Sequence, residues 1–280
     1  MSRSVAANAE LALLLEVAST PKPGNVDRHR EYPALRFEQF LAGAVGTRSG
    51  FASAAAGEPV GRAIERAVAG MSDQDGGNTQ FGAVLAIAPL AAAAGRSDTT
   101  LSPDGVSVVV AETTVEDTVG FYRAFDHVDV AVGDPPEELA ALDVRRGSEA
   151  VSAVRERGLA LAELLAESAD VDDIAREWTR GFPRTFCAAE EIAGREGPVT
   201  DRAAAVFLEL LADRLDTFVI TKHGRETASE VRRRARAALN GTEDVDALAA
   251  ELVDRGINPG TTADLVAAAL FVALQRGTSP

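Results

Sequence analysis

The chain has 280 residues, a formal net charge of −15 and a sequence pI near 4.7. This acidic balance argues against sequence-independent binding to nucleic acid or to an anionic membrane, because both carry negative charge themselves. Lys22 and Lys222 are the only lysines, and an acidic chain with so few lysines is typical of a protein in a high-salt, halophilic cytoplasm.

The single cysteine, Cys187, excludes an intramolecular disulfide and favours a reducing, cytoplasmic location. Cys187 lies between Phe186 and Ala188 with no obvious histidine partner, so we expect it to be buried and structural. The N-terminus lacks the features of a signal peptide. The longest apolar runs, Ala83–Ala94 and Ala263–Leu274, are shorter than the roughly 20 residues that span a bilayer. We therefore expect a cytoplasmic protein without a membrane span.

Apolar residues recur at three- and four-residue spacing through the first half of the chain, which predicts helices. Ala83–Ala94 is apolar on nearly all sides, as in a helix at the centre of a domain, and Pro89 should kink it or mark its first turn. Pro103–Thr113 is rich in valine and could form a strand or a helix. The helices expected in this half are Val5–Ser19, Phe37–Ala44, Glu58–Gly70, Ala83–Ala94 and Thr118–Phe125.

The second half continues the helical pattern, and its last helix is again apolar on most sides. The helices expected here are Glu149–Ser168, Val171–Gly181, Cys187–Ile192, Arg202–Leu215, Glu226–Leu239, Asp244–Arg255 and Ala263–Leu274. No internal repeat or low-complexity linker divides the chain. The sequence therefore predicts one all-α domain over residues 1–280, a multi-helix bundle with two or more central apolar helices.

Four stretches place small, turn-forming and polar residues beside an apolar helix. They are Pro21–Asp27, Gly76–Gly82, Asp216–Gly224 and Asn258–Asp264. Polar groups at the ends of central helices can converge in one cleft, and glycines let phosphate oxygens approach backbone N–H groups. Each stretch alone could also be a helix-ending turn or a helix cap with solvated charges. Their shared character favours a common site.

Two acids in these stretches differ in how well a structural role explains them. Asp264 would lie in the first turn of the last helix, just after the potential caps Thr261 and Thr262, where the helix dipole favours a carboxylate. Asp216 would lie at the C-terminal end of Arg202–Leu215, where the dipole disfavours it. This mismatch makes Asp216 a candidate for function.

Several well-known catalytic motifs do not occur in the sequence. It has no nucleophile elbow, no Cys/His metal spacing, no dinucleotide fingerprint and no P-loop. Asp and Asn groups remain, which suit a hard cation such as Mg²⁺, together with Lys22, Lys222 and Arg28, which suit phosphate. His223 next to Lys222 is also compatible with a plain polar turn at the surface.

Together, the four stretches resemble the triphosphoribosyl-dephospho-coenzyme A synthase family. Pro21–Asp27 matches its Pro-Lys-Pro-Gly-x-Val-Asp stretch, and Asn258–Leu265 matches its Asn-Pro-Gly-x-x-Ala-Asp-Leu stretch. Gly76–Ala83 and Asp216–Gly224 match two further motifs in part. Because the order and spacing agree over nearly the whole chain, it resembles a divergent member of the kind found in halophilic archaea.

The chain departs from the family pattern at three places. Gln80 and Phe81 stand where the family has His-Lys, and Phe218 replaces an asparagine. The family's Gly-Ala-His-x-Asp-Met segment is not recognisable within Arg28–Phe40. These departures bear on the identity of the acceptor substrate more than on the fold.

The resemblance implies an all-α transferase that uses ATP and 3′-dephospho-CoA as substrates and Mg²⁺ as cofactor. It would move the 5-triphosphoribosyl group of ATP to a ribose hydroxyl of dephospho-CoA and release adenine, through an oxocarbenium-like transition state. The product would be the precursor of the prosthetic group on the acyl carrier subunit of citrate lyase or malonate decarboxylase.

The resemblance also implies roles for the matched residues. The predicted catalytic set is Asp27, Asp216 and Asp264. Asp216 and Asp264 would hold Mg²⁺ on the triphosphate, and Asp27 would be the base for the acceptor hydroxyl. The predicted substrate- and phosphate-binding residues are Lys22, Gly24, Asn25, Arg28, Asn78, Thr79, Gly82, Thr217, Lys222, His223, Asn258 and Gly260.

Two other functions stay open. The same glycosyl transfer could use another coenzyme or a pterin as acceptor, which the change at Gln80 and Phe81 favours. A non-catalytic nucleotide-binding homologue would keep the pocket without turnover, although the three retained acids argue against it. The alanine-rich helices would suit a homodimer as well as a core.

Overall fold

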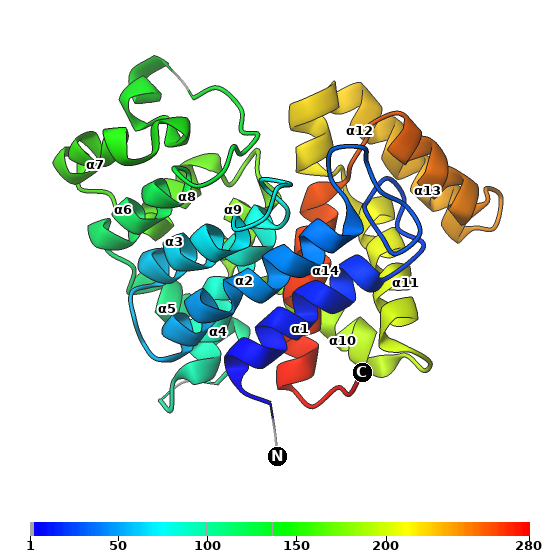
Figure 1. The fold of residues 1–280 in the computed structure, drawn as a ribbon, viewed down its shortest axis with the longest axis horizontal. Coiled ribbons are helices and arrows are strands. Elements are labelled where there is room, and N and C mark those ends of the chain that lie inside the picture. Colours follow the sequence, from blue (N-terminus) through cyan, green and yellow to red (C-terminus); the bar gives the residue numbers. More distant parts are fainter. Residues whose placement is uncertain (1–2, 99, 136) are drawn as a thin grey trace.

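The computed structural model describes residues 3–98, 100–135 and 137–280. These residues form fourteen α-helices, two 3₁₀ helices and no sheet, which confirms the predicted all-α fold (Figure 1). The α-helices are α1 (Val5–Ala18), α2 (Phe37–Ala55), α3 (Val60–Met71), α4 (Phe81–Gly95), α5 (Pro103–Ala111), α6 (Val115–Ala124), α7 (Val151–Arg157), α8 (Leu161–Ser168), α9 (Asp173–Arg180), α10 (Pro183–Gly194), α11 (Val199–Asp213), α12 (Thr217–Leu239), α13 (Val245–Asp254) and α14 (Gly260–Gln275). The 3₁₀ helices are η1 (Glu137–Leu142) and η2 (Val144–Ala150).

Helix α14, red in Figure 1, runs through the middle of the molecule and packs against α1, α4, α10 and α11. Every residue from Leu265 to Leu274 is buried, as is every residue from Ala83 to Ala93 of α4. Burying apolar side chains is the main stabilising contribution to such a core. The two runs expected to form central apolar helices do so, and Pro89 lies inside α4.

Cys187 and the valine-rich run Pro103–Thr113 each test a point of the sequence interpretation. Cys187 is exposed, so its predicted burial is wrong. Consecutive residues point about 100° apart around a helix, and α10 turns Cys187 outward although Phe186 and Ala188 are buried. The valine-rich run Pro103–Thr113 forms helix α5, which buries Val106, Val109 and Val110 at helical spacing.

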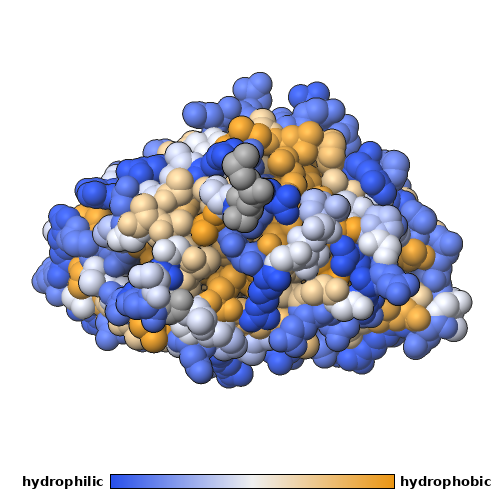
Figure 2. All heavy atoms as spheres, turned by 90° about the horizontal axis from the view of Figure 1, so that it is seen from below, coloured by the Kyte–Doolittle hydropathy of each residue, from blue (hydrophilic) through white to orange (hydrophobic). Residues whose placement is uncertain are grey.

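One face of the molecule shows how hydrophilic and hydrophobic residues are distributed on the surface. Seen from below the view of Figure 1, hydrophilic residues cover most of the rim, and hydrophobic patches surface nearer the middle (Figure 2). Four large hydrophobic side chains are exposed among the described residues: Val45, Val108, Val171 and Leu239. None of the described helices combines the length and apolar character needed to cross a bilayer.

Candidate active site

The loop after α1 buries a lysine. The ammonium of Lys22 has no exposed surface and forms an ion pair with the Glu16 carboxylate from the last turn of α1. Lys22 Nζ also donates to Asn25 Oδ1 at 3.1 Å, and Asn25 Nδ2 donates to Asn258 Oδ1 at 2.8 Å. Burial raises the pKa of Glu16, although the Lys22 charge opposes this shift. These four side chains therefore link α1 and the first stretch to the fourth stretch.

The carboxylate of Asp27 is almost fully occupied by donors of its own loop. Its Oδ2 accepts from Thr20 Oγ1 at 2.7 Å and from Arg30 Nη1 at 3.1 Å. Its Oδ1 accepts from the backbone amides of His29 at 2.8 Å and Arg30 at 3.0 Å. The residue as a whole is 1% exposed. These contacts hold the turn in shape, and the role of Asp27 as a base stays a prediction.

Gly24 allows the first stretch to lie directly against the fourth. Its φ is +73°, and a Cβ at this position would be 2.2 Å from the carbonyl oxygen of Ile257 and 2.9 Å from Pro259. The close approach expected at Gly24 is therefore made by this chain itself. At Gly260 an added Cβ would be 3.2 Å from the ring of Phe218, so the fourth stretch also lies close to the third.

Asp216 is the N-cap residue of α12. Its predicted position at the C-terminal end of a helix is wrong, because α11 ends at Asp213 and a new helix begins directly after Asp216. Asp216 Oδ1 accepts from the Val219 amide at 3.0 Å, and Oδ2 accepts from the amide and the hydroxyl of Thr262, both at 2.8 Å. The helix dipole therefore favours this carboxylate, which ties the starts of α12 and α14 together.

Threonine hydroxyls join three helix starts at this point. Thr217 Oγ1 lies 3.1 Å from Thr261 Oγ1, and Thr261 Oγ1 accepts from the Phe218 amide at 3.1 Å. The Asp173 amide, the first of α9, donates to Thr217 Oγ1 at 3.3 Å. The N-termini of α9, α12 and α14 thus converge, and their dipoles favour negative charge there.

Asp264, in the first turn of α14, lies against the start of α4. A Cβ on Gly82 would be 2.0 Å from Asp264 Oδ2, so glycine is needed for this contact. Burial raises the pKa of Asp264 well above its ordinary value, and the negative charges of Glu16 and Asp216 add to this effect, while the Ala83 amide opposes it. No side-chain donor to Asp264 is recorded among the described residues. Its carboxylate is therefore open in a way that the other two are not.

The second stretch contributes both partnered and unpartnered groups. Asn78 Oδ1 accepts from the Phe81 amide at 3.0 Å and so caps α4. Phe81 packs against Phe125 with 4.8 Å between ring centroids, so it belongs to the core. The Thr79 hydroxyl and both amide atoms of Gln80 are buried without a hydrogen-bond partner in the described part of the chain.

Three predicted phosphate-binding residues lie outside this buried cluster. Arg28, Lys222 and His223 are exposed. Lys222 Nζ lies 6.0 Å from the Phe218 ring centroid, and His223 Nε2 is 3.1 Å from the carbonyl oxygen of Gly256. Both residues belong to the third stretch, and His223 contacts the chain just before the fourth; their binding of phosphate stays a prediction.

Sequence reasoning missed several charged residues that complete this region. Glu16 carried a usable signal, since it interrupts the apolar face of α1. Asp173 forms ion pairs with Arg176 and with Arg184, the latter at 2.6 Å, and burial raises the pKa of neighbouring Asp172. No short-range pattern marked this group, because its members come together only through the packing of α9 and α10.

The carboxylates of the candidate site could supply only one or two of the ligands that Mg²⁺ needs. Across the described residues no group of three or more His, Cys, Asp or Glu side chains is placed to hold a metal ion. Mg²⁺ bound to a polyphosphate needs only one or two carboxylates, since phosphate and water oxygens supply the rest. The open carboxylate of Asp264 fits such a role, and Asp216 fits it less well because both its oxygens already accept hydrogen bonds.

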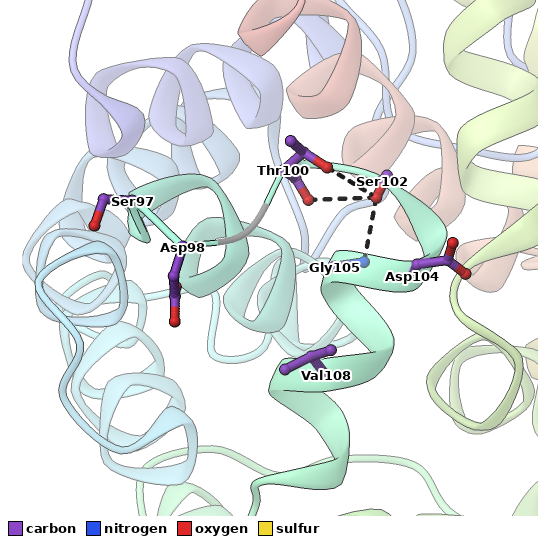
Figure 3. Close-up of a pocket in the computed structure, with 7 residues that line it drawn as sticks. All are labelled: Ser97, Asp98, Thr100, Ser102, Asp104, Gly105 and Val108. Carbon is purple, nitrogen blue, oxygen red and sulfur yellow. Dashed lines mark hydrogen bonds between the residues drawn. The ribbon is translucent and has the colours of Figure 1, made fainter.

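A surface pocket lies at the start of α5 (Figure 3). Ser102 Oγ accepts from the Gly105 amide there at 3.2 Å, which caps the helix. The pocket is lined by Ser97, Asp98, Thr100, Ser102, Asp104, Gly105 and Val108. None of these residues belongs to the four stretches, and two of them are acids, so this pocket is poorly suited to a triphosphate.

Comparison with known proteins agrees with this reading of the four stretches. A crystal structure of a protein from Archaeoglobus fulgidus, provisionally named a triphosphoribosyl-dephospho-CoA synthase, is similar with a TM-score of 0.68 and 26% identity. The match covers 85% of this chain and 99% of that one. None of the curated proteins compared with the chain matches it significantly. The family model of ATP:dephospho-CoA triphosphoribosyl transferases matches residues 2–279, and the chain therefore belongs to this family.

Proposed function

We propose that this protein transfers the 5-triphosphoribosyl group of ATP to a ribose hydroxyl of 3′-dephospho-CoA and releases adenine. Family membership supports the reaction class. The observation that carries it to this chain is the convergence of the starts of α9, α12 and α14 beside Asp264. Helix N-termini bind phosphate groups, and a carboxylate at the same place can stabilise positive charge on ribose or hold a cation.

Asp264 is the residue that we propose to hold Mg²⁺ on the triphosphate, with Asp216 next to it in support. The bound ion would neutralise part of the triphosphate charge. Without the ion, the Asp264 carboxyl would stay protonated to a higher pH than an ordinary aspartate, because burial and neighbouring acids raise its pKa. This coupling between metal and proton is expected wherever a buried carboxylate is a ligand.

Asp27 and Lys22 are better explained as positioning residues than by the base and phosphate-binding roles predicted from the motif. Asp27 accepts four hydrogen bonds at about 3 Å or less from its own loop, and removal of a substrate proton would disturb them. Lys22 is paired with Glu16 in a dry environment. We propose that the exposed cations Arg28 and Lys222 contact the outer phosphates instead.

The direct test is adenine release from ATP with Mg²⁺ in high salt, with and without dephospho-CoA, followed by the mass of the product. We expect adenine only when dephospho-CoA is present, together with a triphosphoribosyl adduct. Adenine release that requires a different coenzyme or a pterin would favour another acceptor. ATP binding without any adenine release would favour a nucleotide-binding homologue.

A different acceptor is the second candidate, and the position of Phe81 favours it. Where the family pattern has a lysine, this chain places an aromatic ring that packs against Phe125 in the core. A phosphate-binding charge is therefore missing from the start of α4. The link of the product to citrate lyase or malonate decarboxylase, the high-salt location and a homodimeric assembly are likewise proposals.

A further inference from the structure

Gln80, the N-cap residue of α4, has a buried side-chain amide that makes no hydrogen bond within the described chain. Only 4% of its surface is exposed, and neither its Oε1 nor its Nε2 has a hydrogen-bond partner among the described residues. The buried hydroxyl of Thr79 next to it is in the same condition. Buried polar groups are nearly always hydrogen-bonded, and leaving them unpaired costs folding free energy. Three unpaired atoms in two consecutive residues therefore require an explanation.

The position of Gln80 points to a substrate rather than to an accident of packing. Two residues further along the chain, the carboxylate of Asp264 packs directly against the backbone of Gly82. The other amides of the candidate site each have at least one partner: Asn78 Oδ1 accepts from the Phe81 amide, and Asn25 Nδ2 donates to Asn258 Oδ1. Gln80 therefore belongs to the segment through which the second stretch meets the fourth, and it is the amide of that segment with neither atom paired.

The chemistry of a carboxamide narrows the ligand class. It presents one acceptor and one donor side by side and carries no charge. A phosphate offers only acceptors, so it would leave Oε1 unpaired. The edge of an adenine ring offers a donor at N6 and an acceptor at N7, which a glutamine amide matches with two hydrogen bonds.

We propose that the amide of Gln80, with the hydroxyl of Thr79, recognises the adenine ring of a substrate. This inference rests on the proposed function, in which both ATP and dephospho-CoA carry adenine. The shared chemistry is the N6/N7 edge, and the experiment distinguishes the two sources.

The test compares substrates that differ by the N6 amine alone. In one arm ATP is compared with purine riboside triphosphate, and in the other dephospho-CoA is compared with its purine analogue. We expect the wild type to favour the amine-bearing substrate in one arm by about 10-fold or more in kcat/KM, as a bidentate contact allows. Gln80→Leu should lower kcat/KM for that substrate by a similar factor and bring the ratio close to one.

Gln275→Leu is the matched control. Gln275 Nε2 is also buried without a partner in the described chain, but it lies at the opposite end of α14 from Asp264. Its substitution should leave both ratios unchanged. A purely structural role for Gln80 would alter the melting temperature and leave the ratios as in the wild type, and that result would overturn the proposal.

The wild type alone provides a test that does not depend on the folding of a variant. If it does not discriminate between the amine-bearing and amine-free substrates in either arm, the proposal is overturned. Calorimetric binding of ATP and purine riboside triphosphate, with Mg²⁺, separates this proposal from the reaction. A wild type that prefers ATP in binding yet releases no adenine would support recognition by Gln80 and contradict the proposed transfer.

Discussion

The charged residues between α12 and α13 and those at the junction of α1, α12 and α14 use the same chemical groups in opposite surroundings. Between α12 and α13, Arg234 lies 2.6 Å from Glu251, and Arg255 lies 2.7 Å from Glu230, all at or near the surface. Such pairs contribute little because water solvates their charges well. Substitutions of these residues should therefore have small effects on the stability of the fold.

At the junction each charge has lost most of its water, so each needs partners in the protein. Lys22, Asp27 and Asp216 have nearly complete sets of partners. Asp264, which is partly buried, and Gln80, which is 4% exposed, do not. The difference indicates which groups maintain the architecture and which are left for a substrate or a cation.

The largest effect is expected for Lys22→Met. The substitution leaves the Glu16 carboxylate buried without its partner, which should lower the free energy of unfolding by about 3–5 kcal/mol. Urea denaturation measures this change. Adding Glu16→Gln to the variant should restore part of the loss, because it removes the unpaired charge. A single variant as stable as the wild type would mean that the pair is not closed in solution.

Asp216→Ala should have the next largest effect, and Asp244→Ala is its matched control. Both residues are N-caps, but Asp244 is exposed and accepts only from the Ala247 amide at 2.8 Å. Loss of that cap should cost about 1 kcal/mol. Asp216 also binds Thr262, so its loss should cost about 3 kcal/mol. Equal unfolding midpoints for the two variants would contradict a joining role for Asp216.

Asp264→Asn should change how stability depends on pH. The folded-state pKa of Asp264 is raised above 3.8, so wild-type stability should fall as pH rises from about 3.8 toward that raised value. The variant lacks this penalty and should gain about 1.4 kcal/mol relative to the wild type for each unit of the shift. Denaturant midpoints from pH 4 upward measure it, with the variant's advantage increasing over this window.

Glu251, which lies in the ion pairs between α12 and α13, should change stability with pH in the opposite direction to Asp264. Ion pairing with Arg234 and Arg255 lowers the pKa of Glu251 to about 2. Its contribution to stability is therefore present above the ordinary carboxyl pKa and is lost as pH falls toward about 2. Glu251→Gln should reduce the acid sensitivity of stability, whereas Asp264→Asn acts at higher pH.

Arg255→Ala should have the smallest effect. Its partners, Glu230 and Glu251, keep access to solvent, so the loss should stay within about 1 kcal/mol. The effect should shrink further in high salt, which screens exposed charges. A loss as large as that of Lys22→Met, measured by the same urea titration, would remove the distinction between the two regions.

Much of the fold followed from the pattern of apolar residues. Ala83–Ala94 and Ala263–Leu274 are apolar on nearly all sides, and only a central position buries every side of a helix. The sequence also indicated that the four stretches would meet, and the contacts of Asn25 with Asn258 and of Asp216 with Thr262 join three of them.

The parts that were not predicted depend on long-range packing. Asp216 follows an apolar helix closely in sequence, and only the break after Asp213 reveals that it begins a new one. The partner of Lys22 could not be inferred, because many acids were available and pairing depends on how the loop folds back on α1. The unpaired amide of Gln80 is visible only once every neighbouring donor and acceptor is known.

Asp264 is the open carboxylate on which we propose that turnover depends, and the variant Asp264→Asn removes its charge alone. We would measure acceptor-dependent adenine release by this variant and by the wild type, with unfolding midpoints for both at the same pH. We expect turnover to fall by about 100-fold or more, because the variant no longer holds the Mg²⁺ that would neutralise the triphosphate. We expect the fold to be at least as stable as that of the wild type. Turnover equal to that of the wild type would contradict it.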